Sequence, residues 1–220
     1  MNTIELFAGT GSFSKVAASF DYDIYGTDYE QVDDEFVIHL VKDVRKVSRS
    51  SFPLRILPVD ILWASPPCEG FSVAAIGHNW TGGKCAYIPN SETAHRSIAL
   101  VKETLRLIDE LKPKWWFIEN PRGLLRKLDL IPEDAIRHTV TYCQYGDTRM
   151  KPTDIWTNAP WWTPRPMCKN GMPCHVAAPR GSSTGTQGIK GYKDRSRIPP
   201  ALFEEIFTQL ESVDKLKFTP

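Results

Sequence analysis

The sequence predicts an α/β fold, in which a mainly parallel sheet carries helices on both faces. Short apolar runs alternate with amphipathic stretches as far as about residue 160, which is the rhythm of such folds. The runs are apolar throughout rather than alternating with polar residues, as expected for strands buried on both sides. We expect strands over residues 3–7, 22–27, 59–64 and 115–118, and helices over 13–20, 91–111 and 200–210.

The two longest predicted helices have identifiable faces or ends. In residues 91–111, four apolar side chains fall on one side of a helix, and Pro113 follows as a stop. They are Ile98, Val101, Leu105 and Ile108. The last helix begins with Pro200, whose missing N–H costs nothing in the first turn. Residues after Tyr145 are rich in proline and glycine and show little periodicity, so we expect an irregular appendage there.

Length and composition predict one compact body. The chain has 220 residues, of which 41% are hydrophobic and 24% charged, so it can bury a core. We divide it into an α/β body over 1–157, an insert over 158–197 and a C-terminal helix over 198–220 that packs back on the body. The start lacks a basic, apolar leader and no apolar run approaches the ~20 residues of a membrane span. We therefore expect a cytoplasmic protein without a membrane partner.

Charge is unevenly distributed along the chain. Residues 141–200 hold nine Lys and Arg against three Asp and Glu, whereas the rest of the chain has a net charge of −5. Such a basic segment suits binding of a polyanion, and a solvated loop with a chance excess of basic residues is an equally good explanation.

The first strand runs into a glycine turn. The segment Glu5-Leu6-Phe7-Ala8-Gly9-Thr10-Gly11-Ser12 leads from a strand to a helix, and its glycines would let the backbone approach a ligand closely. Asp28 ends the second strand as an acceptor for ribose hydroxyls, and Tyr29 beside it could cover an adenine. Asp43 could bond the adenine amino group. These residues favour an adenosyl ligand, although capped turns and surface acids would explain them too.

Two later strand ends carry reactive groups. In Ser65-Pro66-Pro67-Cys68, two prolines stiffen the chain and present a thiol that could attack an electrophile, although a single cysteine is more often inert. Glu119-Asn120-Pro121 brings a carboxyl group to the same edge. A thiolate near a carboxylic acid is what addition to a pyrimidine ring requires.

These strings, in this order, resemble the DNA (cytosine-5)-methyltransferase family. E-L-F-A-G-T-G-S resembles its methyl-donor motif, S-P-P-C-E-G-F-S its nucleophile motif, and E-N-P its Glu-Asn-Val motif. The resemblance implies a Rossmann-like S-adenosylmethionine-dependent methyltransferase fold that flips a cytosine out of duplex DNA. It implies Cys68 as nucleophile and Glu119 as the residue that activates the base. The donor-binding residues it implies are Phe7, Ala8, Gly9, Thr10, Gly11, Ser12, Asp28, Tyr29, Asp43, Val44, Pro67 and Leu100.

The chain departs from the family pattern after Tyr145-Gly146. In place of Gln-x-Arg-x-Arg it has Arg149, Lys151 and Thr153, and we assign Arg149 and Lys151 to phosphate contact or base polarisation. Ser196-Arg197-Ile198-Pro199-Pro200 resembles the later, mainly structural Arg-x-Leu-x-Pro motif. The C-terminal Gly-Asn-Ser-Val motif is absent.

The family's large target recognition domain is also missing. Only the insert stands in its place, with Trp161-Trp162, Arg165, Lys169, Arg180 and residues 181–188 available to contact DNA, or to form a surface loop. This reduction predicts a very short recognition sequence or a partner protein that supplies specificity. We expect a monomer of the kind that protects phage DNA from restriction, and residues 71–87 as a lid over the base.

Cysteines other than Cys68 offer a second chemistry. Cys143, Cys168, Cys174 and His175 are four possible zinc ligands, yet their spacing matches no standard zinc finger. The sequence alone therefore does not favour a structural zinc. Two alternatives to the main function stay open: a non-catalytic DNA-binding or regulatory relative, and a methyltransferase that acts on tRNA or free nucleotides.

Overall fold

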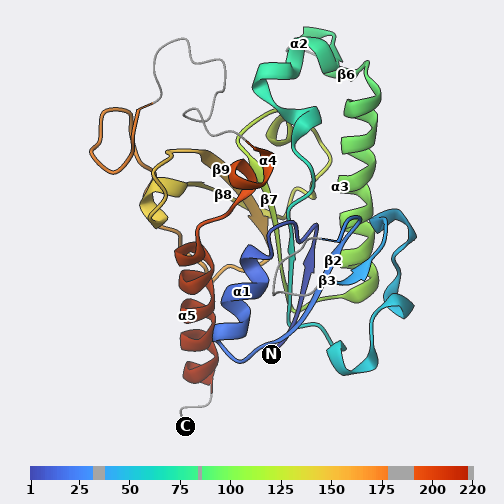
Figure 1. The fold of residues 1–220 in the computed structure, drawn as a ribbon, viewed down its shortest axis with the longest axis vertical. Coiled ribbons are helices and arrows are strands. Elements are labelled where there is room, and N and C mark those ends of the chain that lie inside the picture. The colour runs from blue at the N-terminus through green and yellow to red at the C-terminus, as the bar shows by residue number, and fades with distance from the viewer. Residues whose placement is uncertain (32–37, 84–85, 178–190, 218–220) are drawn as a thin grey trace.

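The protein has a central seven-stranded sheet with helices on both faces (Figure 1). The computed structural model describes residues 1–31, 38–83, 86–177 and 191–217. In spatial order the strands are β3 (Ile38–Val41), β2 (Asp23–Asp28), β1 (Asn2–Leu6), β4 (Ile61–Ala64), β7 (Trp115–Pro121), β9 (Pro152–Thr157) and β8 (Ile136–Thr141).

The first five strands of that order are parallel, and β9 runs antiparallel to both of its neighbours. From β1 the chain adds strands first on one side, toward β3, and then on the other, toward β7. This reversal of direction is the switch point at which doubly wound sheets bind ligands. The α/β prediction and its Rossmann-like topology are confirmed.

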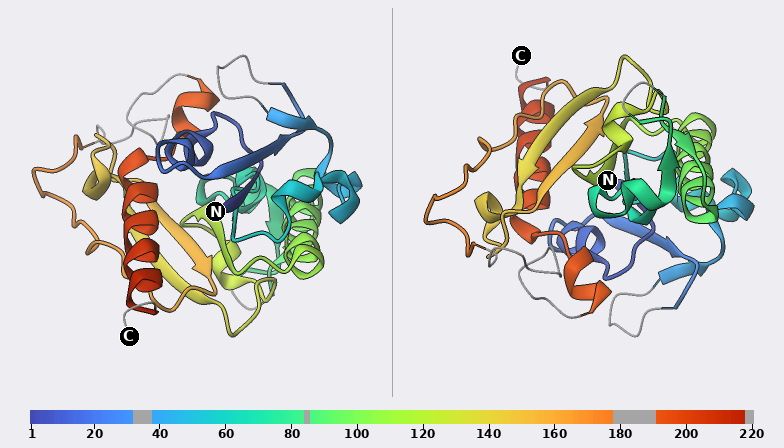
Figure 2. Two further views of the ribbon diagram at one scale, coloured as in Figure 1. Left: turned by 90° about the horizontal axis from the view of Figure 1, so that it is seen from below. Right: turned by 90° about the horizontal axis from the view of Figure 1, so that it is seen from above.

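Helices α1 (Ser12–Ser19) and α5 (Pro200–Lys217) cover one face, and α3 (Glu92–Leu111) covers the other, as the end-on views of Figure 2 show. Two short helices complete the set, α2 (Ile76–Asn79) and α4 (Tyr192–Ser196), with a small hairpin of β5 (Trp80–Thr81) and β6 (Ile88–Pro89). The short 3-10 turns used below are η1 (Val44–Lys46), η2 (Arg49–Ser51), η3 (Leu54–Ile56), η4 (Glu69–Phe71) and η8 (Tyr142–Tyr145).

Alternate residues of the strands supply the two sides of the core. Trp63 of β4 faces α1 and α5, where Phe13 packs edge-on against Phe203 with ring centroids 5.5 Å apart. Leu62, one residue earlier, faces α3 together with Leu107. Both faces are buried, which explains why the strands read as uniformly apolar.

The predicted elements appear close to their expected bounds. Helix α3 begins after Ser91, whose hydroxyl accepts the Ala94 N–H at 3.1 Å, and it ends at Lys112 in the left-handed conformation. The final helix continues past residue 210 to Lys217. The expectation of an irregular chain after Tyr145 was wrong for residues 152–157, because they form β9 inside the sheet. Among the described residues, no helix is long and apolar enough to cross a membrane.

Candidate active site

The turn after β1 is built for close approach by a ligand. Phe7, Gly9 and Gly11 all have positive φ, so the backbone curls at the carboxyl edge of the sheet before α1 begins. The Ala8 N–H donates to the Thr27 carbonyl at 3.0 Å, and the Gly9 N–H donates to Oδ2 of Asp28 at 2.8 Å. The second strand therefore holds the glycine turn through its last residue.

The carboxylate of Asp28 is a shared acceptor at this edge. Its Oδ1 accepts the N–H groups of Tyr29 and Glu30 at 2.7 and 3.2 Å. Tyr29 is 66% exposed at this edge. Asp43 follows β3 at the same edge, and its oxygens accept from Arg45, which holds the pKa of Asp43 below its usual range.

The remaining residues implied for donor binding fall around the same edge. Val44 is buried, and Phe7 and Leu100 pack on the cluster that contains it. Pro67 follows β4 and is half-buried, as are Thr10 and Ser12, whose hydroxyls lie 2.9 Å apart. The twelve residues thus lie at the end of β2, at the start of α1, in η1, on α3 and in the loops after β1, β2, β3 and β4.

A buried acid lies behind the glycine turn. Glu5, in β1, accepts the N–H groups of Phe13 and Ser14 at 3.3 and 3.0 Å and so caps α1 from the sheet. Burial raises the pKa of Glu5 to about 7, and the nearby charge of Asp28 adds to that rise.

The Cys68 loop follows β4 and is fixed on three sides. The Asn120 amide donates to the Pro66 carbonyl at 3.0 Å, and the Phe71 N–H donates to the Cys68 carbonyl at 3.0 Å. Gly70 lies so close to α3 that a β-carbon there would come within 2.5 Å of Ser97 Oγ. The thiol itself is half-buried, so the loop presents it in one position at the sheet edge.

Glu119 lies on β7, next to the strand that leads to Cys68. Ile118 pairs with Ala64, which places Glu119 beside the start of the Cys68 loop. The carboxyl group is buried, and its Oε1 accepts the Tyr142 hydroxyl at 2.9 Å. Burial raises the pKa of Glu119, whereas the charge of Lys151 and the hydrogen bonds from Tyr142 and Ser65 oppose that rise.

The electrostatics of these groups are linked. Burial raises the pKa of the Cys68 thiol, the charge of Glu119 raises it further and the charge of Lys151 lowers it. Burial in turn lowers the pKa of Lys151. The Lys151 ammonium lies 4.7 Å from the centre of the Tyr142 ring and donates to the Arg195 carbonyl at 3.0 Å. The Cys68 thiol, the Glu119 carboxyl group and the Lys151 amine therefore lie together in one partly desolvated place, which we call the Cys68 corner.

Arg149 makes its hydrogen bonds with Asp147 and with the chain at and just after α4. It is buried and its guanidinium is paired with Asp147, with further hydrogen bonds to the carbonyls of Asp194, Arg195 and Arg197. This side chain holds the α4 segment beside the Lys151 ammonium, which donates to one of the same carbonyls.

Sequence reasoning assigned no role to two residues that complete the corner. The motif gives Asn120 no role separate from Glu119. In the structure its side-chain amide donates to the Pro66 carbonyl, while its Oδ1 is buried without a partner among the described residues. Tyr142 has no signal in the sequence, because its contact with Glu119 joins residues 23 positions apart, one in the η8 turn and the other on β7.

Residues 71–87, predicted as a lid, contain η4, η5 (Val73–Ala75), α2 and the β5–β6 hairpin, as far as they are described. Trp80 is buried there and donates its indole N–H to the Gly70 carbonyl at 2.6 Å. In the insert, Trp162 is buried in the core and Arg165 pairs with Glu205, while residues 181–188 and Arg180 lie outside the described residues.

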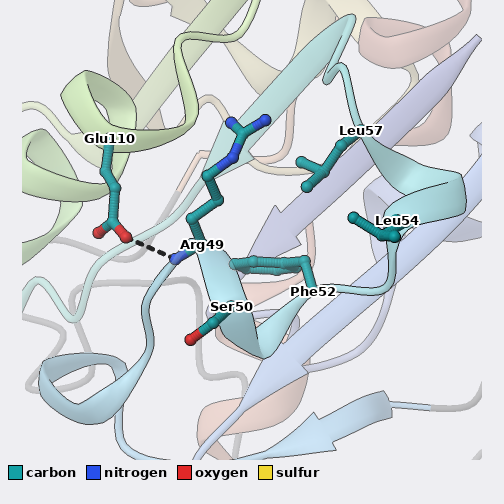
Figure 3. A pocket seen from close by; sticks show the side chains of 6 residues that line it. All are labelled: Arg49, Ser50, Phe52, Leu54, Leu57 and Glu110. Atoms are coloured by element: carbon teal, nitrogen blue, oxygen red, sulfur yellow. Dashed lines mark hydrogen bonds between the residues drawn. The ribbon is translucent and has the colours of Figure 1, made fainter.

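A surface hollow of about 500 Å³ lies elsewhere, between η2, η3 and the end of α3 (Figure 3). Its lining is Arg49, Ser50, Phe52, Leu54, Leu57 and Glu110, and the Arg49 N–H donates to Glu110 at 2.6 Å. The segment leads into the start of β4, so this hollow is at the opposite edge of the sheet from Cys68 and none of the candidate site residues lines it.

The comparison with protein families is decisive. The family model described as "C-5 cytosine-specific DNA methylase" matches residues 1–131, which is more than half of the chain. The chain belongs to this family. Its members take their methyl group from S-adenosylmethionine. The sequence-based prediction of a DNA cytosine-5 methyltransferase is confirmed at the level of the family.

Relatives support this membership over different lengths. A "Probable DNA (cytosine-5)-methyltransferase" of Frog virus 3 (isolate Goorha) is 27% identical over 226 residues, covering 94% of this chain and 98% of the viral protein. The type II methyltransferases M.DdeI of Desulfomicrobium norvegicum and M.CviJI of Paramecium bursaria Chlorella virus IL3A are 24% and 27% identical over 57% and 58% of this chain.

The chain spans only 29% and 32% of the length of those two type II enzymes. A crystal structure of a DNA modification methyltransferase encoded within an E. coli prophage is similar at 20% identity with a TM-score of 0.49, covering 71% of this chain and 46% of that one.

Proposed function

We propose that this methyltransferase transfers a methyl group to carbon 5 of a cytosine in duplex DNA, through a covalent bond between Cys68 and the base. The observation that carries the proposal is the placement of Cys68 and Glu119 toward the ends of the adjacent strands β4 and β7. The hydrogen bond from the Asn120 side chain to the Pro66 carbonyl ties the Cys68 loop to β7. Family membership supplies the class of reaction, and this corner supplies the two groups that the reaction needs.

The donor-binding edge fits an adenosyl ligand. The backbone between Phe7 and Gly11 leaves no side chain over the turn at its two glycines, and Asp28 presents a carboxylate beside the exposed ring of Tyr29. S-adenosylmethionine, when bound, supplies an electrophilic methyl group. We assign its ribose to Asp28 and one face of its adenine to Tyr29, because hydroxyls pair with carboxylates and purines stack on aromatic rings.

Cys68 begins the reaction on the base. Its thiolate forms a bond to carbon 6 of the cytosine, and the electrons of the carbon 5–carbon 6 double bond move toward N3 and the exocyclic amine. Glu119, whose pKa is raised by burial, provides a hydrogen at N3 where negative charge develops. Carbon 5 then has carbanion character and takes the methyl group. Removal of the carbon 5 proton by a base re-forms the double bond and expels the Cys68 thiolate.

Lys151 stabilises the reactive ionisation state. Its positive charge lowers the pKa of Cys68, which favours the thiolate in an otherwise desolvated place. We propose that Arg149 is a positioning residue, because its guanidinium already donates hydrogen bonds to Asp147 and to three carbonyls of the α4 segment. The target base must leave the duplex to reach this corner, because carbon 6 is inaccessible inside a stacked helix.

The test is a product analysis. Purified protein is incubated with unmethylated duplex DNA and S-adenosylmethionine, the DNA is digested to nucleosides, and these are analysed by mass spectrometry. We expect 5-methylcytosine with the wild type and none with Cys68→Ala, which should still bind the donor. A parallel reaction with tRNA tests the substrate class. No modified nucleoside in DNA, from protein that binds the donor, would contradict the proposal.

A further inference from the structure

We propose that Cys143, Cys168, Cys174 and His175 bind a structural zinc ion. The fold gathers these four side chains, which are far apart in the sequence, so that one ligand atom from each lies within 4.8 Å of every other. Three cysteines and one histidine form one of the usual donor sets of structural zinc sites. The proposal is independent of the proposed function, since none of the four belongs to the Cys68 corner.

The distances match a tetrahedral ion. Zn–S bonds of about 2.3 Å and Zn–N bonds of about 2.0–2.1 Å place neighbouring sulfurs about 3.8 Å apart and sulfur about 3.6 Å from nitrogen. Here Cys174 Sγ lies 3.7 Å from Cys143 Sγ and 3.8 Å from His175 Nδ1. Cys168 Sγ lies 3.4 Å from His175 Nδ1 and 3.0 Å from Cys174 Sγ. Of these four distances, only the last must lengthen appreciably when an ion occupies the centre.

Both ligand-bearing segments are held in place by contacts of their own. Cys143 is in η8, directly after β8. The other three ligands lie in residues 168–175, and the chain just before them is fastened to η8 by Arg165. The Arg165 guanidinium donates to the Gln144 carbonyl at 2.7 Å, and its backbone N–H donates to the Tyr145 hydroxyl at 2.9 Å. The Cys168 N–H donates to Thr141 Oγ1 at 2.8 Å. The ligands are therefore arranged before any ion binds, which lowers the ordering cost of binding.

One of the sulfurs has a hydrogen-bond donor of its own. The Gln144 side-chain amide donates to Cys174 Sγ at 3.4 Å, as groups that orient metal ligands do. A disulfide between Cys168 and Cys174 is the competing explanation, but it would use two of the four groups. It gives no reason for Cys143 and His175 to converge on the same point. A single zinc ion uses all four.

The ion would fasten the 168–175 loop to the turn that leads toward the active-site corner. Tyr142 precedes Cys143 and donates to Glu119, and its own N–H bonds to the Met150 carbonyl, one residue before Lys151. Zinc would thus stabilise the outer side of the sheet at β8 and fix the position of Tyr142. Loss of the ion should lower thermal stability as well as activity.

Metal content tests the site directly. The full chain is produced in zinc-supplemented medium, and metal is quantified by mass spectrometry against protein concentration. We expect one zinc per chain. Protein stripped by a chelator and titrated with Co²⁺ should develop visible d–d bands of tetrahedral cobalt and a sulfur-to-cobalt charge-transfer band in the near ultraviolet. Readdition of zinc should abolish both and raise the melting temperature.

Variants locate the ion. Cys168→Ser, Cys174→Ser and His175→Asn should each weaken cobalt binding more than about 100-fold, because changes to residues that only hydrogen-bond a metal ligand already cost about 10–100-fold. Lys169→Ala changes an exposed neighbour in the same loop, and Cys68→Ser removes a cysteine outside the cluster; both should keep full metal content. Protein that contains no zinc and gives no cobalt spectrum, or zinc retained by the ligand variants, would overturn the proposal. Finding Cys168 and Cys174 oxidised to a disulfide in metal-free protein as first purified would also overturn it.

Discussion

The hydroxyl of Tyr142 donates a 2.9 Å hydrogen bond to Glu119, although one residue is in the turn after β8 and the other is in the middle of the sheet on β7. Strand β9 lies between them, and the residue before it, Lys151, has its ammonium over the Tyr142 ring. The position of the buried acid therefore depends on the part of the chain that is least regular in sequence.

Lys151 should set the pH dependence of methyl transfer. The reactive state has Cys68 deprotonated and Glu119 protonated. Burial raises the pKa of both groups, and the charge of Lys151 lowers both. The population of that state is greatest midway between the two pKa values. Lys151→Met raises both, so we expect the optimum to move to higher pH by about 1 unit, the size that one adjacent charge gives.

The matched control for that change is Lys151→Arg, which keeps the charge and should keep the optimum close to that of the wild type. The measurement is the single-turnover rate against pH at saturating donor. An optimum that stays in place in Lys151→Met would show that Lys151 does not act on these groups through its charge.

Asn120 should act by positioning the Cys68 loop. Asn120→Ala removes the amide that bonds the Pro66 carbonyl, and a buried unpaired group costs about 1–3 kcal/mol. If that loss falls on the transition state, the transfer rate drops about 10–100-fold while donor affinity is unchanged. Asn158→Ala is the control, because Asn158 accepts the Trp116 N–H at the opposite edge. Equal rates in the two variants, per folded molecule, would remove Asn120 from the mechanism.

Asp28 should contribute to donor binding. Asp28→Ala leaves donor hydroxyls and the Gly9 N–H without an acceptor, so we expect weaker binding by about 1–3 kcal/mol in titration calorimetry. Asp43→Ala is the companion variant at the same edge, where the carboxylate is already engaged by Arg45. Donor affinity that survives Asp28→Ala intact would place the ligand elsewhere.

Glu5 should make the fold less stable as pH rises. Burial raises the pKa of Glu5 from 4.5 to about 7, so the folded state binds a proton that the unfolded state has lost. Unfolding therefore releases a proton in this window, and the free energy of unfolding falls as pH increases from about 4.5 to about 7. This difference in the pKa of Glu5 corresponds to roughly 3 kcal/mol in the free energy of unfolding, at about 1.4 kcal/mol per pKa unit.

Glu5→Gln cannot titrate, so its free energy of unfolding should change less between pH 5 and pH 8 than that of the wild type. Urea unfolding at several pH values measures both slopes. Identical pH dependence in the two proteins would show that Glu5 has an ordinary pKa in the folded state.

The sequence was sufficient for the parallel strands β1, β2, β4 and β7, though not for β3, and for the strand ends that carry Cys68, Asp28 and Glu119. Uniform apolar runs identify strands buried on both faces, and the ends of parallel strands share one edge. Strand β9 was missed because Pro152, Thr153 and Asp154 suggest a loop, whereas the fold buries Asp154 and bonds it to Thr139 of β8 at 2.7 Å.

Contacts between distant, irregular segments had no periodic signal. The spacing of Cys143, Cys168, Cys174 and His175 fits no zinc finger, and only the packing of the 163–175 segment against η8 brings the four side chains together. The use of Arg149 as a clamp on the α4 segment is equally a property of the folded chain.

A covalent bond between Cys68 and the target cytosine can be trapped on a modified substrate. Duplex DNA containing 5-fluorocytosine is incubated with the protein and S-adenosylmethionine, because carbon 5 then has a fluorine instead of the proton that must leave. We predict a stable protein–DNA adduct whose mass spectrum places the nucleotide on the peptide containing Cys68, and no adduct with Cys68→Ala. An adduct on another cysteine, or 5-methylcytosine formed by Cys68→Ala, would contradict the account.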